Sequence, residues 1–191
     1  MLTQLIPSKV RRKILALYFH NIDQTYYLRE IVRLTNEEVN AVKRELDILH
    51  NAKVLTREKR TNKVFYALSK SFSLYDEFVR IFTKDTSLAT LIYKNASRLG
   101  KIKFIAVSTK FSKKTQIKED EIYVLFVGIV VIPEVESIMQ AARKEFGWEI
   151  NYTVMTEDEI QFRKKNNDPF LWKFLKQPKV MLVGHEEDLL K

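Results

Sequence analysis

Apolar residues follow two different spacings along this chain, and the spacing changes near residue 100. Before that point they mostly recur every three or four positions, which is typical of helices with one buried face, except for short β-prone segments at 25–28 and 54–68. After it, consecutive or alternating apolar residues indicate strands separated by helical stretches. We therefore expect an α+β protein with domains at 1–70 and 100–191, joined by a helical connector at 71–99.

The stretch from Leu28 to Leu55 predicts two helices with a polar corner between them. The first helix is expected at 28–34, Thr35 and Asn36 end it, and the second helix is expected at 38–51. Three residues of the second helix share one apolar face: Val42, Leu46 and Leu49. Another face is polar and mostly able to donate hydrogen bonds; it holds Asn40, Lys43, Arg44 and Asp47. This pattern is typical of a DNA-reading helix-turn-helix, although a surface helical hairpin with a solvated face would share it.

The flanking segments predict a helix before this motif and a hairpin after it. A helix is expected at 8–19, with Ser8 as its N-cap, and a short β-prone segment at 25–28. Residues 54–68 alternate β-branched or aromatic positions around a central turn at 60–62. Charged hairpin tips are common, but this tip follows a candidate recognition helix, so we expect it to contact DNA backbone. Its polar and basic residues are Arg57, Lys59, Arg60, Asn62 and Lys63.

Residues 5–70 resemble an ArsR-like winged helix-turn-helix domain, chiefly through the sequence segments YYLREIVRLTN, AVKRELDIL and NAKVLTREKRTNKVFYAL. The resemblance implies that the second helix of the motif enters the major groove and that the hairpin forms the wing. On that helix we expect Asn40, Lys43 and Arg44 to reach base edges or nearby phosphates, because Asn suits adenine and Arg or Lys suits guanine. The residues expected to contact the DNA backbone are Arg29, Arg57, Lys59, Arg60, Asn62 and Lys63.

The net charge of +9 is concentrated in the first domain. Residues 1–70 contain 14 Lys and Arg against 7 Asp and Glu, whereas residues 71–191 contain 19 against 17. A basic domain attracts polyanions and gains affinity by releasing their counterions. The charge distribution therefore favours double-stranded DNA as the partner of the first domain.

Residues 71–98 predict two helices that are interrupted near Lys84 and Asp85. The first carries an apolar stripe at Leu74, Phe78, Ile81 and Phe82, and the second at Leu88, Leu91, Ile92 and Ala96. We expect these stripes to pack on the C-terminal domain or on a second copy of the chain. Because helix-turn-helix proteins commonly bind paired half-sites as two-fold dimers, we expect a homodimer.

The C-terminal segment predicts strands at 101–107, 122–130, 148–155 and 179–183. Helices are expected at 133–146, after Thr156, from Pro169 to about Lys176, and from Glu186 onward. The sequence segments INYTVMTEDEI, NDPFLWKFL and QPKVMLVGHEEDL resemble parts of the small nucleotidyltransferase domain of the polymerase-beta superfamily. The resemblance covers about residues 100–191 and implies an α/β domain with a small mixed sheet.

Active members of that superfamily carry Gly-Ser after the first strand and Asp-x-Asp on the next, and the two aspartates bind magnesium. In this chain the two motifs fall on Thr109-Lys110 and on Glu121-Ile122-Tyr123. One carboxylate therefore remains, and we expect no catalysis, no metal and no cofactor. The alternatives are an active nucleotidyltransferase that uses Glu119 and Glu121, and a winged helix that binds proteins instead of DNA.

The remaining sequence patterns do not change this interpretation. The chain has no Cys, its three His residues are scattered, and its longest apolar run, from Tyr123 to Pro133, is too short for a membrane span. The N-terminal residues lack a signal-peptide pattern, so we expect a cytoplasmic protein. The sequence predicts a DNA-binding transcriptional regulator and does not define an effector, whether a small molecule or a protein.

Overall fold

The computed structural model describes residues 2–114, 117–118 and 121–191, and they mix helices with small sheets, as the sequence predicts. The chain divides into two units, of which the first ends at Phe82 and the second begins at Thr83. Among the described residues, no helix combines the length and the hydrophobicity that crossing a bilayer requires.

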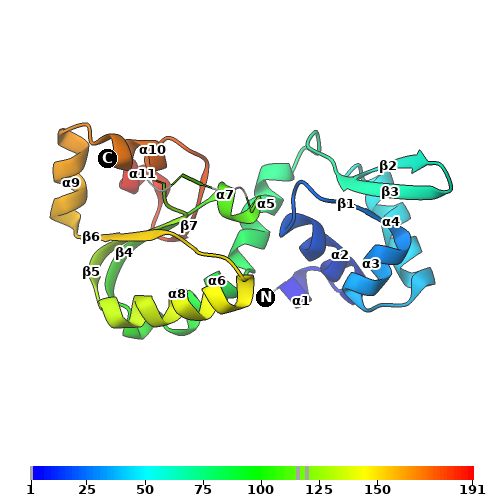
Figure 1. The fold of residues 1–191 in the computed structure, drawn as a ribbon, viewed down its shortest axis with the longest axis horizontal. Coiled ribbons are helices and arrows are strands. Elements are labelled where there is room, and N and C mark those ends of the chain that lie inside the picture. Colours follow the sequence, from blue (N-terminus) through cyan, green and yellow to red (C-terminus); the bar gives the residue numbers. More distant parts are fainter. Residues whose placement is uncertain (1, 115–116, 119–120) are drawn as a thin grey trace. The chain divides into compact units, whose positions relative to one another are not determined.

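The first unit is built from short helices and one small sheet (Figure 1). Its elements are α1 (Leu2–Leu5), α2 (Lys9–Phe19), β1 (Thr25–Tyr27), α3 (Leu28–Thr35), α4 (Val39–Asn51), β2 (Leu55–Arg60), β3 (Lys63–Leu68) and α5 (Tyr75–Lys84), the last of which runs across the division. The predicted helices at 8–19, 28–34 and 38–51 and the hairpin at 54–68 are confirmed to within one residue at each end. The short helix α1 was not predicted.

Local chemistry sets the ends of these helices. Ser8 caps α2, because its hydroxyl accepts a hydrogen bond from the backbone N–H of Arg11 at 3.2 Å. Asn36 ends α3 with a φ of 50°, in the left-handed region that Asn tolerates better than most residues. This residue makes the sharp corner between α3 and α4.

The core of the first unit lies between its helices and the sheet. Ile14 of α2, Ile31 of α3 and Leu46 of α4 are each 0% exposed. The sheet is antiparallel in the order β1-β3-β2, and the hydroxyl of Tyr18 donates to the backbone oxygen of Tyr66 at 3.0 Å. Helix α2 is thereby fixed to the central strand of the sheet.

Helix α5 completes this core. Phe82 is 0% exposed and stacks on Phe19 with ring centroids 5.1 Å apart, while Phe78 lies 5.4 Å from the same ring. The next helix, α6 (Ser87–Lys94), instead contributes Leu88 and Ile92 to the core of the second unit. The expected connector at 71–99 is therefore divided between the two units. Phe78 and Phe82 of its first stripe pack on the first unit and not on the C-terminal domain, whereas Leu88, Leu91 and Ile92 pack on the second. The expected burial of Leu74, Ile81 and Ala96 is wrong, because these side chains are exposed.

The second unit has a four-stranded mixed sheet in the order β6-β5-β4-β7. Strand β4 pairs antiparallel with β5 and β7, and β5 pairs parallel with β6. The remaining elements of this unit are α6, η1 (Ala96–Arg98), β4 (Gly100–Ser108), α7 (Thr109–Ser112), β5 (Val124–Val130), α8 (Ile132–Phe146), β6 (Tyr152–Met155), α9 (Glu157–Lys165), α10 (Pro169–Leu175), β7 (Lys179–Val183) and α11 (Glu186–Leu190).

Both faces of this sheet are covered. Val124 and Phe126 of β5 point into a core shared with α6 and α8, whereas Leu125 and Val127 point into a second core with α9 and α10. Burial on both faces explains why β5 is apolar throughout. Figure 1 shows α8 running along one side of this sheet.

Three elements of the second unit differ from the prediction. Strand β5 begins at Val124 instead of residue 122. Strand β6 begins at Tyr152 instead of residue 148, because Trp148 turns into an aromatic cluster with Phe111 and Tyr123, at centroid distances of 5.4 and 4.9 Å. The short helix α7 was not predicted, and it begins where the backbone N–H of Lys110 donates to the hydroxyl of Ser108.

Candidate nucleic-acid interface

The outer face of α4 is defined here by Asn40, Lys43, Arg44 and Asp47, which recur at the spacing of one helical face. The first three side chains are exposed. Within the described part of the chain, neither Lys43 nor Arg44 forms an ion pair or a side-chain hydrogen bond. Two cations and one amide are thus free to bind a ligand on this face.

The opposite side of α4 and the preceding corner are tied to α2 by charged contacts. Glu45 of α4 receives hydrogen bonds from the hydroxyl of Ser8 at 2.6 Å and from the guanidinium of Arg11 at 2.7 Å. Glu37, in the corner, lies 3.0 Å from Lys9 and 2.6 Å from Lys13. These contacts neutralise cations of α2 and fix the orientation of α4, while its outer face keeps its positive charge.

Glu37 should make the stability of the first unit depend on acid pH. Hydrogen bonds from Lys13 and Lys9 hold the pKa of Glu37 below its ordinary value of 4.5. A carboxyl group whose pKa is lowered by folding stabilises the native state above its unfolded pKa and loses that contribution as pH falls through the folded pKa. The variant Glu37→Gln should therefore lose less stability than the parent when the pH falls from 6 to 3, as measured by chemical denaturation. Equal losses in both proteins would show that Glu37 does not contribute to this dependence.

The hairpin β2–β3 carries its predicted DNA-binding residues on two different faces. Arg57 pairs with Asp47 of α4 at 3.6 Å, so this face of β2 lies toward α4. Lys59 is two residues further along the strand and shares that face. Arg60 and Lys63 are directly opposite each other in the ladder and belong to the other face.

On this other face the cations cover aromatic rings. Lys63 lies 4.2 Å from the ring centre of Tyr27, and Arg60 lies 5.1 Å from that of Phe65. Arg60 also pairs with Glu58 at 2.6 Å. The structure therefore places Arg57 in contact with the outer face of α4 and Lys59 on the same face of β2, whereas Arg60 and Lys63 lie on the opposite face of the hairpin.

The two remaining predicted residues lie elsewhere. Asn62 is exposed in the turn between β2 and β3, where Thr61 has a φ of 53°. Arg29 is exposed on the first turn of α3. Periodicity alone could not reveal the contact of Asp47 with Arg57, because that contact depends on how the hairpin packs on α4.

In the second unit, two residues from the positions where the sequence resemblance would place the nucleotidyltransferase motifs, Lys110 and Glu121, are adjacent in space. Glu121 lies 3.0 Å from Lys110 and 3.5 Å from Lys173. The hydrogen bond from Lys110 holds the pKa of the Glu121 carboxyl below its ordinary value, and burial only partly opposes this. Glu119 lies outside the described residues. No cluster of three or more potential metal ligands is found among the residues that the structure describes.

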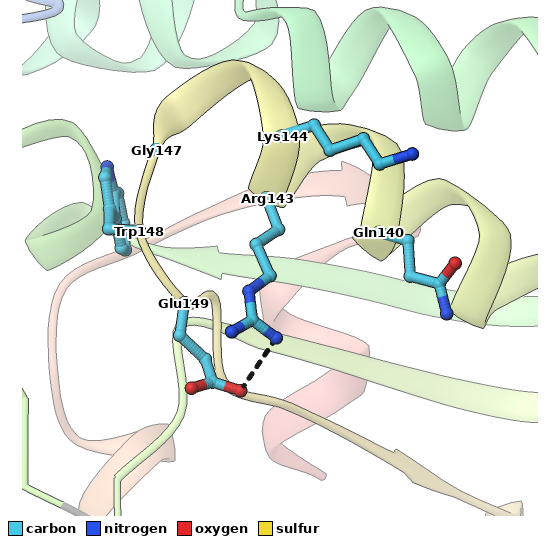
Figure 2. Close-up of a pocket in the computed structure, with 6 residues that line it drawn as sticks. All are labelled: Gln140, Arg143, Lys144, Gly147, Trp148 and Glu149. Atoms are coloured by element: carbon cyan, nitrogen blue, oxygen red, sulfur yellow. Dashed lines mark ion pairs between the residues drawn. The ribbon is translucent and has the colours of Figure 1, made fainter.

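A surface hollow of about 550 Å³ lies at the end of α8. Figure 2 shows that its side chains diverge, since the Trp148 ring lies on the other side of the loop from Arg143, and Lys144 and Gln140 extend away from both. Arg143 pairs with Glu149 across the hollow at 3.5 Å. Because its polar groups do not converge, this hollow is not a candidate ligand site.

In comparisons with known proteins, no family model, no curated protein and no solved structure matches this chain.

Proposed function

We propose that this protein is a cytoplasmic transcriptional regulator that binds double-stranded DNA. The single observation that carries the proposal is the outer face of α4. Asn40, Lys43 and Arg44 are exposed there, and the ion pairs of α2 leave the two cations unneutralised. Amide and guanidinium groups on one helix face suit the acceptor patterns of purines in the major groove.

The hairpin supports the same proposal. We propose that the first unit is a winged helix-turn-helix of the kind its sequence resembles, with α3 and α4 as the motif and β2–β3 as the wing. Arg57 and Lys59 share the α4 side of the hairpin, so the wing would contact phosphates beside the groove that α4 enters. Arg60, Lys63, Asn62 and Arg29 would add contacts from the hairpin tip and from α3.

We propose that the second unit is a nucleotidyltransferase-like domain without catalytic activity. Two ammonium groups already neutralise Glu121, and a divalent cation would have to displace both. The unit would then serve in dimerisation, in sensing an effector or in binding a partner. A mass measurement in solution tests the proposed homodimer, since a monomer at micromolar concentration would contradict it.

Selection of bound duplexes from a random DNA pool tests the proposal with the full chain. We expect one enriched sequence, repeated as two half-sites separated by a whole helical turn, because a dimer presents two copies of α4. Its affinity should fall steeply between 50 and 200 mM salt as counterion release is suppressed.

Two outcomes would contradict this proposal. Failure to retain any DNA at low salt would favour a protein-interaction module. Incorporation of labelled nucleotide in the presence of magnesium would favour an enzyme.

A further inference from the structure

Asp47 is an acidic residue on an otherwise electropositive surface. It follows Arg44 by three positions and Lys43 by four, so it belongs to the outer face of α4. Its side chain is 47% exposed. If this face contacts DNA, the carboxylate enters a region of high phosphate density.

A carboxylate in that position repels phosphates unless a hydrogen-bond donor meets it. In the free protein its partner is Arg57, whose guanidinium forms an ion pair with it at 3.6 Å, beyond hydrogen-bond distance. The pair is weak, because the Arg57 side chain is itself 52% exposed and solvent screens both charges. This ion pair can therefore break when Asp47 binds another donor and Arg57 binds a phosphate.

We infer that Asp47 is a specificity-determining residue that accepts a hydrogen bond from the exocyclic amino group of a cytosine in the major groove. The inference rests on the proposed DNA binding and deepens it. Cytosine presents an N4 amino donor at its major-groove edge, and a carboxylate is the complementary acceptor. Adenine also offers an amino group, but its neighbouring N7 is an acceptor and repels a carboxylate.

The change of partner of Asp47, from Arg57 to cytosine, also gives Arg57 a second role. When Asp47 turns to cytosine, Arg57 loses its partner and can bind a backbone phosphate from the α4 side of the hairpin. At a base without an amino donor, Asp47 keeps Arg57, which then cannot bind a phosphate, or it stays unpaired among phosphates; either outcome penalises the wrong sequence. Asp47 thus lowers affinity for DNA in general and raises the ratio of specific to non-specific binding.

The test compares the parent protein with Asp47→Ala, Asp47→Asn and Arg57→Ala, each as the full chain. Bound duplexes are selected from a random pool, and dissociation constants are measured for the selected duplex and for an unrelated one. With Asp47→Ala we expect the preference for cytosine at one position of each half-site to fall by about five- to tenfold. Affinity for the unrelated duplex should rise severalfold, because a negative charge has been removed.

The other variants separate base recognition from a merely structural role. Asp47→Asn should move the preference at that position toward adenine, which an amide recognises. Arg57→Ala should weaken binding to both duplexes and keep the cytosine preference. A role limited to positioning Arg57 predicts that Asp47→Ala weakens binding in the same way as Arg57→Ala, and that outcome overturns the inference.

The inference and the proposed function fail differently. If the parent protein selects no DNA, the proposed function fails and the inference falls with it. If the parent selects a defined sequence and the Asp47 variants select the same one with unchanged affinities, the inference alone is overturned.

Discussion

Replacing Arg44 with Ala should weaken specific DNA binding by about 1–3 kcal/mol, which is roughly a 5- to 150-fold loss of affinity. Arg44 is exposed on the outer face of α4, and its guanidinium has five donors in a planar fork that matches guanine O6 and N7. The measurement is an equilibrium titration of the selected duplex at a fixed salt concentration. Preference for guanine at one position should be lost together with affinity.

Arg80→Ala is the matched control for this variant. Arg80 is also an exposed arginine of the first unit, but it lies on α5 and has the same charge without the position on α4. Its removal should change affinity only slightly. Equal losses in both variants would mean that Arg44 contributes general charge and no base recognition, and an unchanged affinity would remove Arg44 from the interface.

Replacing Phe82 with Ala should destabilise the first unit by about 3–5 kcal/mol, the usual cost of removing a buried Phe. The Phe82 ring is 0% exposed and stacks on Phe19 at 5.1 Å, so its loss opens a cavity beside α2. Denaturant unfolding of the full chain, followed by circular dichroism, measures the change. Because α2 is fixed to α4 through Glu45, DNA binding should fall at temperatures where this unit begins to unfold.

Phe162→Ala is the control for the Phe82 variant. Phe162 is 68% exposed on α9 of the second unit, and its removal should change stability by less than about 0.5 kcal/mol. If Phe82→Ala were equally mild, α5 would not be an integral part of the first unit. The boundary at residue 70 expected from the sequence would then describe the folded domain better than the division after Phe82.

Three helix starts could be predicted because a single capping side chain marks each of them. Ser8, Thr156 and Asp168 each accept a hydrogen bond from a backbone N–H three residues later, and this pattern is visible in the sequence. The partners of an apolar stripe could not be predicted in this way. Periodicity shows that Phe82 and Leu88 are buried, but it does not show that they enter different cores.

For the candidate site, the exposed face of α4 could be predicted from the sequence, whereas its contacts with other elements could not. Helical spacing alone places Asn40, Lys43 and Arg44 on one face, and the structure finds all three exposed. The contact of Asp47 with Arg57, which adjusts the charge of that face, and the contact of Glu37 with α2, which neutralises α2, join residues of different elements. They depend on tertiary packing, so neither could be derived from spacing along the chain.

The two-faced hairpin also limits how the length of the wing can change. Side chains alternate along β2, so inserting one residue ahead of Arg57 would turn Arg57 and Lys59 away from α4 and turn Arg60 toward it. Inserting two residues would restore the original faces and only move the tip outward. Viable variants of this wing should therefore differ in length by even numbers of residues in each strand.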